Sequence, residues 1–283
     1  MQRGLLITVT ALAAATLACN IGVNLPRVNT SPTQTLAINE AASSGQAALV
    51  QVTMGAGTLT IGPGAQGLVE GQVQYNVADW KPVVTHTGNS VSIIQGHSNS
   101  VAIPNASNDI VNDWSLKLGS APMTLTVDAG AYQGTLNLGG LALTSLDIQD
   151  GASKAKVVFD QPNPQTMSRL TYDTGASDVE LDKLANANAQ SIEFKGGAGN
   201  YVLDFSGKLA HDVAVGVTSG VSSIRLVVPA GVSARVAVSG GLNSVTANSS
   251  FSQSGDSYTQ TGSGPTITIN VDMGVGSLKI VNQ

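Results

Sequence analysis

Apolar residues recur in pairs on either side of a glycine, and this pattern returns in eight copies along the chain. In the copy from Leu170 to Leu181, apolar residues lie five and three positions before Gly175, and four and six positions after it. Apolar residues two positions apart share one face of a strand, and glycine adopts turn conformations that other residues resist. Each copy therefore predicts a strand, a tight turn and a second strand. The predicted turn glycines are Gly55, Gly130, Gly151, Gly175, Gly197, Gly220, Gly241 and Gly274.

The spacing of the copies indicates how these strands are arranged. From Gly130 to Gly241 the glycines follow one another at steps of 21, 24, 22, 23 and 21 residues. A fixed period of this length is typical of solenoids, in which one unit cannot bury its apolar face alone but stacked units can. We therefore predict an all-β fold, a parallel β-solenoid with repeats of about 20–24 residues.

Stacking makes a specific prediction about contacts. Residues three positions before successive glycines should lie side by side, so that Ile148 contacts Tyr172 and Tyr172 contacts Phe194. The alternative is an antiparallel sandwich, because a strand, a turn and a strand can also form a hairpin. Sandwiches favour Asn-Gly and Asp-Gly turns, and among the eight glycines only Gly151, after Asp150, has such a partner.

The N-terminus has the pattern of a targeting signal. Arg3 is followed by an apolar stretch over residues 4–15, and Ala18 precedes Cys19, the single cysteine of the chain. This pattern resembles a bacterial lipoprotein signal, which implies removal of residues 1–18, lipid attachment at Cys19 and a place in the cell envelope outside the cytoplasm. The alternatives are an ordinary secretory signal and an uncleaved anchor.

Composition divides the rest of the chain into three segments. Residues 19–46 are rich in Asn, Ser, Thr, Pro and Ala without a sustained period, which predicts a flexible tether. Residues 47–122 begin with the first repeat copy and continue with short alternating runs, so we predict an N-terminal β region. Residues 123–283 form the predicted solenoid.

Two insertions interrupt the repeats, at Gly62–Pro122 and Asn248–Pro265. Insertions in solenoids often emerge as loops on the binding face, so we expect contact surfaces there. The second insertion consists mainly of Ser, Gly, Thr and Gln. Because a polar loop buries little surface, we expect deletion of Phe251–Ser263 to leave stability nearly unchanged.

Charge and cysteine content narrow the functional classes. Charged residues make up 11% of the chain and the net charge is −5, with no basic patch, so a nucleic-acid partner is not expected. A single cysteine also precludes an internal disulfide.

Three acids alternate along one predicted strand. Asp178, Glu180 and Asp182 should project from the face opposite the apolar residues. They could form the acidic cleft of a polysaccharide enzyme, or a cation site, or a solvated outer face with Arg225 as an ionic partner. A glycosidase needs two carboxylates at a defined separation, which the sequence alone does not establish.

Metal and cofactor sites are not expected. Asp128, Asp173 and Asp272 occupy one repeat position, but the copies between them carry other side chains, so the carboxylate ladder is interrupted. Their more common role is to accept hydrogen bonds from turn amides.

The histidines and tryptophans also lack a site pattern. His86, His97 and His211 have no ligand spacing to one another. Trp80 and Trp114 could form a sugar-stacking platform, but within one insertion we expect them to pack a small core.

Two segments carry a family resemblance. Tyr75–Pro82 and Asn112–Leu118, preceded by the Gly-Ala-Gly-Thr-Leu-Thr-Ile run that begins at Gly55, resemble the N-terminal domain of bacterial toast-rack proteins. The resemblance implies a β-solenoid envelope protein, grouped with adhesin-like proteins and with the C-terminal domains of cell-wall-active-antibiotics-response (LiaF-type) membrane proteins. The LiaF-type branch has N-terminal transmembrane helices where this chain has a lipoprotein signal.

Three functional hypotheses follow. The leading one is a non-enzymatic, lipid-anchored scaffold or adhesin-like protein that binds a cell surface or a polysaccharide. The second is an envelope-stress regulator of the LiaF type, and the third is a β-helical carbohydrate-active enzyme.

Overall fold

The computed structural model describes residues 29–43, 47–96 and 110–282. The predicted signal peptide, Cys19 and His97 lie outside these residues. The described chain is almost entirely β-structure, with two short 3-10 helices, η2 (Ala78–Trp80) and η3 (Leu184–Ala187). Its strands are β1 (Gln34–Glu40), β2 (Ala48–Pro63), β3 (Val69–Tyr75), β4 (Val83–Thr87), β5 (Ser90–Ile94), β6 (Asn112–Leu118), β7 (Met123–Asn137), β8 (Leu143–Val158), β9 (Leu170–Asp182), β10 (Ser191–Asp204), β11 (Val213–Val228), β12 (Val232–Ala247), β13 (Ser252–Ser254), β14 (Ser257–Gln260) and β15 (Ser263–Asn282).

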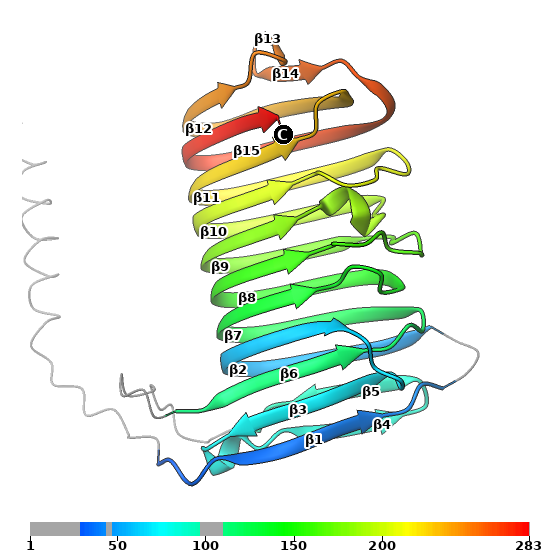
Figure 1. Cartoon of the computed structure of the whole chain (residues 1–283). Helices are drawn as coiled ribbons and strands as arrows, with labels where there is room; N and C mark the ends of the chain where they lie inside the picture. Colours follow the sequence, from blue (N-terminus) through cyan, green and yellow to red (C-terminus); the bar gives the residue numbers. More distant parts are fainter. Residues whose placement is uncertain (1–28, 44–46, 97–109, 283) are drawn as a thin grey trace, which may run out of the picture.

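The strands form one mostly parallel sheet in which long strands stack as rungs (Figure 1). From β2 through β7, β8, β9, β10, β11 and β15 to β12, every neighbouring pair is parallel. Each long strand bends in its middle, so its two halves lie in facing layers with the core between them (Figure 1). The parallel pairing agrees with the predicted architecture and contradicts the antiparallel sandwich.

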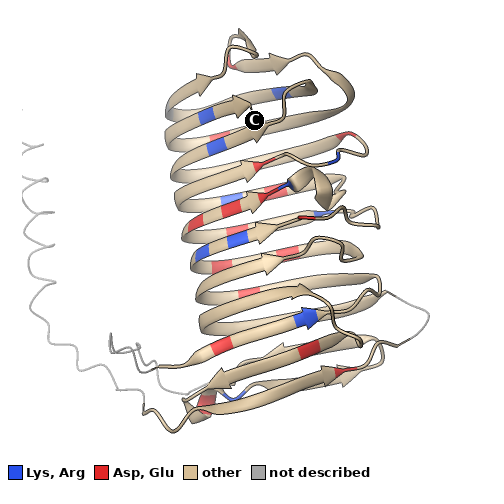
Figure 2. Cartoon of the chain, viewed as in Figure 1, with Lys and Arg blue, Asp and Glu red and all other residues tan. Residues whose placement is uncertain are grey.

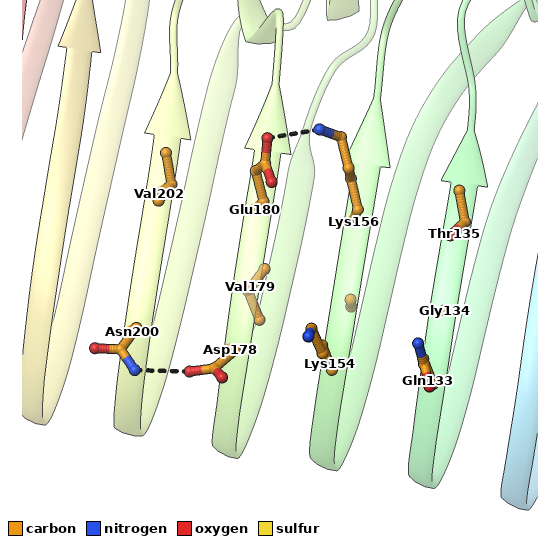
Figure 3. A pocket seen from close by; sticks show the side chains of 11 residues that line it. Gln133, Gly134, Thr135, Lys154, Lys156, Asp178, Val179, Glu180, Asn200 and Val202 are labelled. Carbon is orange, nitrogen blue, oxygen red and sulfur yellow. Dashed lines mark hydrogen bonds and ion pairs between the residues drawn. The ribbon is translucent and has the colours of Figure 1, made fainter.

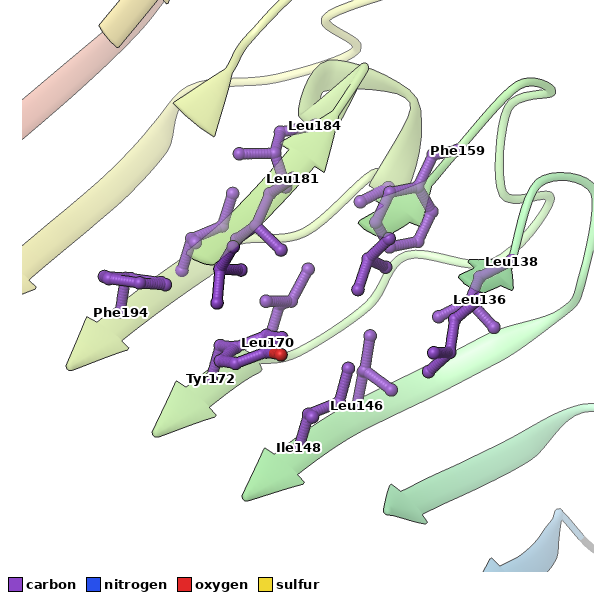
Figure 4. Packing of buried hydrophobic residues seen from close by; sticks show 14 of the residues in the cluster. Leu136, Leu138, Leu146, Ile148, Phe159, Leu170, Tyr172, Leu181, Leu184 and Phe194 are labelled. Atoms are coloured by element: carbon purple, nitrogen blue, oxygen red, sulfur yellow. The ribbon is translucent and has the colours of Figure 1, made fainter. Parts of the chain in front are cut away.

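The predicted contacts between rungs are confirmed. Ile148 is the register partner of Tyr172, and Tyr172 is the partner of Phe194. The rings of Tyr172 and Phe194 lie 5.8 Å apart between centroids. Figure 4 shows these side chains stacked inside the sheet with Leu146 and Leu170. Burial of one such large apolar side chain contributes about 1.5–3 kcal/mol, so the core is built from rows that run through the rungs.

The recurrent glycines do not form turns, which corrects their predicted role. Each lies inside a continuous strand, for example Gly175 within β9, and none of the eight has a positive φ. A Cβ on Gly175 would lie 2.3 Å from the carbonyl oxygen of Gly151 in the preceding rung. Glycine is therefore needed because the stacked backbones approach closely at the bend, and not because the bend requires a positive φ.

The predicted tether is wrong over its last part. Gln34–Glu40 form β1, which pairs antiparallel with β3 along its whole length, and Ile38 is buried. The strand was missed because its alternation rests on only two aliphatic residues, Leu36 and Ile38, in a polar segment. β1 is the outermost strand at the N-terminal end of the sheet.

The first insertion closes the N-terminal end of the stack. β5 pairs with the first half of β2, and β6 pairs with its second half. β3 then covers β6, and β4 covers β5, both in antiparallel orientation. Over residues 62–96 and 110–122, which the structure describes, this insertion is therefore integral to the sheet.

The C-terminal end departs from sequential stacking. β15 lies between β11 and β12, so the last strand of the chain is not the last rung. The second insertion forms the β13–β14 hairpin, and β14 pairs with the first half of β12. Phe251, Tyr258 and Gln260 are buried against this end of the core. The expectation that this insertion is an exposed polar loop that buries little surface is therefore wrong.

Candidate functional site

A shallow hollow lies on the outer face of the second halves of β7, β8, β9 and β10 (Figure 3). Its volume is about 330 Å³, and it is open to solvent. The side chains that line it include Gln133, Lys154, Lys156, Asp178, Glu180 and Asn200. Figure 2 shows that charged residues are sparse over the sheet and gather in this middle part of the stack.

Strand alternation places the predicted acids in this hollow. Val179 and Leu181 point into the core and are buried, whereas Asp178, Glu180 and Asp182 point outward from β9. The sequence prediction about the direction of these side chains is consistent with the structure. Asp178 and Glu180 line the hollow itself.

The ionic partner of the acids is Lys156, and this corrects the choice of Arg225. The Lys156 Nζ lies 2.6 Å from Glu180 Oε1 and 4.0 Å from Asp182 Oδ2. The hydrogen bond to Glu180 raises the pKa of the Lys156 ammonium. Arg225 lies in the same outward row, but Val202 separates it from Glu180.

The remaining polar groups of the hollow are arranged in neighbouring pairs. Asn200 Nδ2 donates a hydrogen bond of 2.8 Å to Asp178 Oδ1. Lys154 is the register partner of Asp178 on the other side and forms no ion pair among the described residues. Exposed pairs of this kind contribute only about 0–1 kcal/mol to stability, so they shape the surface more than they stabilise it.

The carboxylate ladder that could have bound a metal is interrupted in space as well as in sequence. Lys195 is the register partner of Asp173, and Gln149 separates Asp173 from Asp128. Asp272 pairs with Thr218 and Ser239. In the part of the chain that the structure describes, no three His, Cys, Asp or Glu side chains gather as a metal site requires.

The two described histidines lie in different parts of the fold. His86 on β4 contacts Glu40 at the end of β1, with 2.8 Å between Nδ1 and Oε2. His211 lies in the loop before β11, where Nδ1 is 2.8 Å from the carbonyl oxygen of Asp212. The structure does not bring these histidines together.

The tryptophans also have separate surroundings. Trp114 on β6 is 1% exposed, and its Nε1 donates a hydrogen bond of 2.9 Å to Asn112 Oδ1. Trp80 is half-buried in η2. The expectation of a core role is confirmed for Trp114.

A polar cluster that the sequence analysis missed lies inside the sheet, at the bend of β8 and β9. The buried carboxylate of Asp150 accepts hydrogen bonds from Tyr172 at 2.7 Å and from Ser153 at 3.0 Å. Thr174 and Ser177 donate to its other oxygen. The repeat pattern could have indicated this cluster, because Asp150 and Thr174 each directly precede the recurrent glycine of their own copy.

Burial perturbs the tyrosines of this cluster. Desolvation raises the pKa of Tyr132 to about 12, although the hydrogen bond to Tyr172 opposes the shift. Desolvation also raises the pKa of Tyr172, and the nearby Asp150 carboxylate adds to the effect. Both hydroxyls therefore stay protonated over the ordinary pH range and remain able to donate hydrogen bonds.

With the fold in view, comparison with known proteins identifies the family. Residues 27–171 match the family described as the N-terminal domain of toast_rack, DUF2154, which is 145 of the 283 residues. The chain belongs to the toast-rack family of bacterial proteins. Part of this toast-rack match covers β1, the segment that the sequence analysis assigned to the tether.

Several solved structures are similar to this toast-rack protein over most of its length. A structure described as a putative cell adhesion protein from Clostridium sporogenes is 18% identical, with a TM-score of 0.49, and the match covers 89% of this chain and 99% of that one. A putative adhesin from Bacteroides fragilis is 12% identical, with a TM-score of 0.37 and coverage of 90% and 99%. A putative lipid binding protein from Parabacteroides distasonis is 9% identical, with a TM-score of 0.32 and coverage of 90% and 99%.

No curated protein matches the sequence. In the described part of the chain, no helix combines the length and the apolar character that a membrane span requires.

Proposed function

We propose that this toast-rack protein is a non-enzymatic, lipid-anchored binding protein of the bacterial cell envelope, with an adhesin-like role outside the cytoplasm. The observation that carries the proposal is the set of contacts that hold the two acids in the outer hollow. Glu180 is held by Lys156, and Asp178 accepts a hydrogen bond from Asn200. Both side chains are thus held by neighbours on an open face, whereas a catalytic site gathers its acids and bases in one enclosed pocket.

Paired charges on an open face suit recognition better than proton transfer. Across an interface, charges mainly steer encounter and select the partner. The hollow presents lysines on β8 beside acids on β9, so a partner with the opposite arrangement would be favoured (Figure 3). We expect this partner to be a component of a cell surface, including its polysaccharides.

The charge pattern can be inverted without removing the pair. In the double variant Lys156→Glu with Glu180→Lys, the two side chains can still form an ion pair. Cells that display the full-length variant should attach to immobilised surface polysaccharides and cell-surface proteins less well than the wild type. Lys195→Glu is the matched control, because Lys195 lies in the first half of β10, away from the hollow. Equal attachment by the inverted and wild-type proteins would refute a contact role for this face.

Catalysis is tested on the same protein. If the purified protein cleaved polysaccharides and Glu180→Gln abolished the cleavage, the non-enzymatic proposal would be wrong.

Attachment to the membrane forms a separate part of the proposal. We propose that Cys19 becomes the first residue of the mature protein and carries a diacylglycerol. Two acyl chains anchor stably because each buried methylene contributes about 0.8 kcal/mol. Intact-mass measurement of membrane-extracted protein should show the added lipid, and Cys19→Ala should remove it. A mature protein that begins at Cys19 without added mass would contradict this assignment.

A further inference from the structure

The last rung has a strand edge that no other described strand covers. β14 pairs with β12 only from Ala234 to Ala237, while β12 continues to Ala247. β15 covers the opposite edge of β12 along its length. The second half of β12 therefore forms the upper boundary of the front layer in Figure 1, with backbone groups free to pair with an added strand.

The other end of the stack shows what such an edge accepts. The second half of β2 is covered by β6, which lies parallel to it. There Trp114 is the register partner of Leu59 and continues the core beyond it toward β3. Followed rung by rung, the row of Leu59 leads to Val245 on β12. No described residue takes the place of Trp114 over Val245.

A hollow of about 370 Å³ lies at this place. Val238, Val245 and the ring of Tyr258 line it, together with the polar residues Ser239 and Asp256. Val245 is only half-buried, unlike its counterparts in the middle of the stack. The hollow can thus receive an aromatic side chain, as the space over Leu59 receives Trp114.

Charge indicates which strand fits beside this hollow. Arg225 and Lys279 are register partners on β11 and β15, and Lys279 also partners Thr246 on the free strand. Neither cation forms an ion pair among the described residues, so two like charges face solvent next to the edge. Asp256 lines the hollow from the turn between β13 and β14, where it would repel an acid. An acidic residue is therefore favoured beside Thr246 and disfavoured near the hairpin.

We propose that the second half of β12 binds an extended acidic peptide strand of a partner protein, with an aromatic side chain over Val245 and the adjacent acidic side chain beside Thr246, toward Lys279. Backbone hydrogen bonds to the free edge would provide affinity, and the two side chains would provide specificity. This site is distinct from the outer hollow of Figure 3, so it stands or falls independently of the proposed contact face.

The probe is a fluorescent peptide with the sequence Thr-Ser-Trp-Glu-Leu-Thr-Leu, which is adapted from β6. The full-length protein is titrated into the peptide, and binding is followed by fluorescence anisotropy. We expect saturable binding that weakens by about tenfold or more when Trp becomes Ala or Glu becomes Lys. Replacing both the first Leu and the Thr that follows it by Pro should abolish binding. Successive N–H groups of an edge strand alternate between the sheet and solvent, so one of the two prolines removes an N–H that faces β12. Absence of saturable binding, or equal binding of the Pro peptide, would overturn strand addition.

Protein variants locate the site. Val245→Lys places a charge under the aromatic side chain and should abolish binding, whereas Ser244→Lys, which projects outward from the same strand, should preserve it. If Val245→Lys does not fold, Lys279→Glu tests the same site from the surface and should weaken the Glu peptide while strengthening the Lys peptide. Binding unchanged by Lys279→Glu would refute the proposal. So would concentration-dependent self-association that the peptide cannot displace, because a second copy would then occupy the edge.

Discussion

The hydroxyl of Tyr172 donates a hydrogen bond of 2.7 Å to the carboxylate of Asp150, one rung away and inside the sheet. Because Ser153, Thr174 and Ser177 also donate to this carboxylate, a buried negative charge is satisfied by hydroxyl groups of two adjacent rungs. We infer that the cluster fixes the register between β8 and β9, because a shifted rung would leave the carboxylate without donors.

Replacement of Asp150 should therefore be costly. Asp150→Asn introduces an amide donor where hydroxyl donors already converge, so we expect a loss of about 2–4 kcal/mol in the free energy of unfolding. Urea titration followed by circular dichroism measures this loss. Asp173→Asn, at an exposed position of β9, is the control and should change the value by less than about 0.5 kcal/mol. Equal stability of the two variants would mean that the buried charge is not coupled to the register.

The tyrosines of the cluster predict sensitivity to alkali. The folded-state pKa of Tyr132 is about 12, above the ordinary value of 10.0, so the unfolded chain loses its proton first. The contribution of Tyr132 to the free energy of unfolding should be constant below pH 10 and should be lost between about pH 10 and 12, by on the order of 2–3 kcal/mol. Thermal melts from pH 8 to pH 12 measure the effect. Tyr132→Phe should show a smaller decline, and parallel pH profiles of the two proteins would contradict the assignment.

The stacked glycines predict intolerance of a single methyl group. In Gly175→Ala the new Cβ would meet the backbone carbonyl of Gly151, which cannot move away as a side chain could. We expect a loss of about 1–3 kcal/mol, typical of overpacking. Gly62→Ala in β2 is the matched control, because nothing lies within 4 Å of its Cβ position. Chemical denaturation of both variants distinguishes a crowded bend from a general effect of removing glycine.

Deletion of the C-terminal hairpin should destabilise the protein. Removal of Phe251–Ser263 exposes the end of the core that Phe251 and Tyr258 cover, at about 1.5–3 kcal/mol for each buried side chain. It also removes the hydrogen bonds from Gln260 Nε2 to the carbonyl oxygens of Pro229 and Val232. Calorimetry should show a melting temperature several degrees lower. Gln253→Ala at the exposed tip should have no such effect, and an unchanged melting temperature after the deletion would restore the dispensable-loop hypothesis.

Much of the architecture could be predicted from the recurring apolar pairs. Pairs such as Leu170 and Tyr172 return at a nearly constant interval from a glycine, and only parallel stacking brings them together. What the glycine does was not predictable from one copy. Its role depends on the close approach of Gly175 to Gly151, which exists only after the rungs have stacked.

The order of the rungs could not be predicted for a different reason. β12 and β15 carry the same alternation of apolar residues, so either of them fits against β11. Local pattern specifies the face of a strand, but the choice among similar neighbours depends on the connections and on the whole stack. The same holds for the hairpin, where Phe251 and Tyr258 stand alone among polar residues.

Part of the candidate site could be predicted from the sequence. Alternation placed Asp178 and Glu180 outward, and the structure agrees. Lys156 could also have been identified, because it follows Gly151 by as many residues as Glu180 follows Gly175. The free edge of β12 could not be predicted from the sequence, because it depends on how far β14 extends along β12.

The position of β15 affects the order in which the molecule can be completed. A chain made from its N-terminus onward can assemble β2 to β11 as each strand is produced. β12 and the hairpin that pairs with it cannot join the stack until Ser263–Asn282 has been made and has entered between β12 and β11. The upper part of the sheet therefore closes only once β15 has been made, and a chain that stops before β15 keeps a gap between β11 and β12 that its own strands cannot fill.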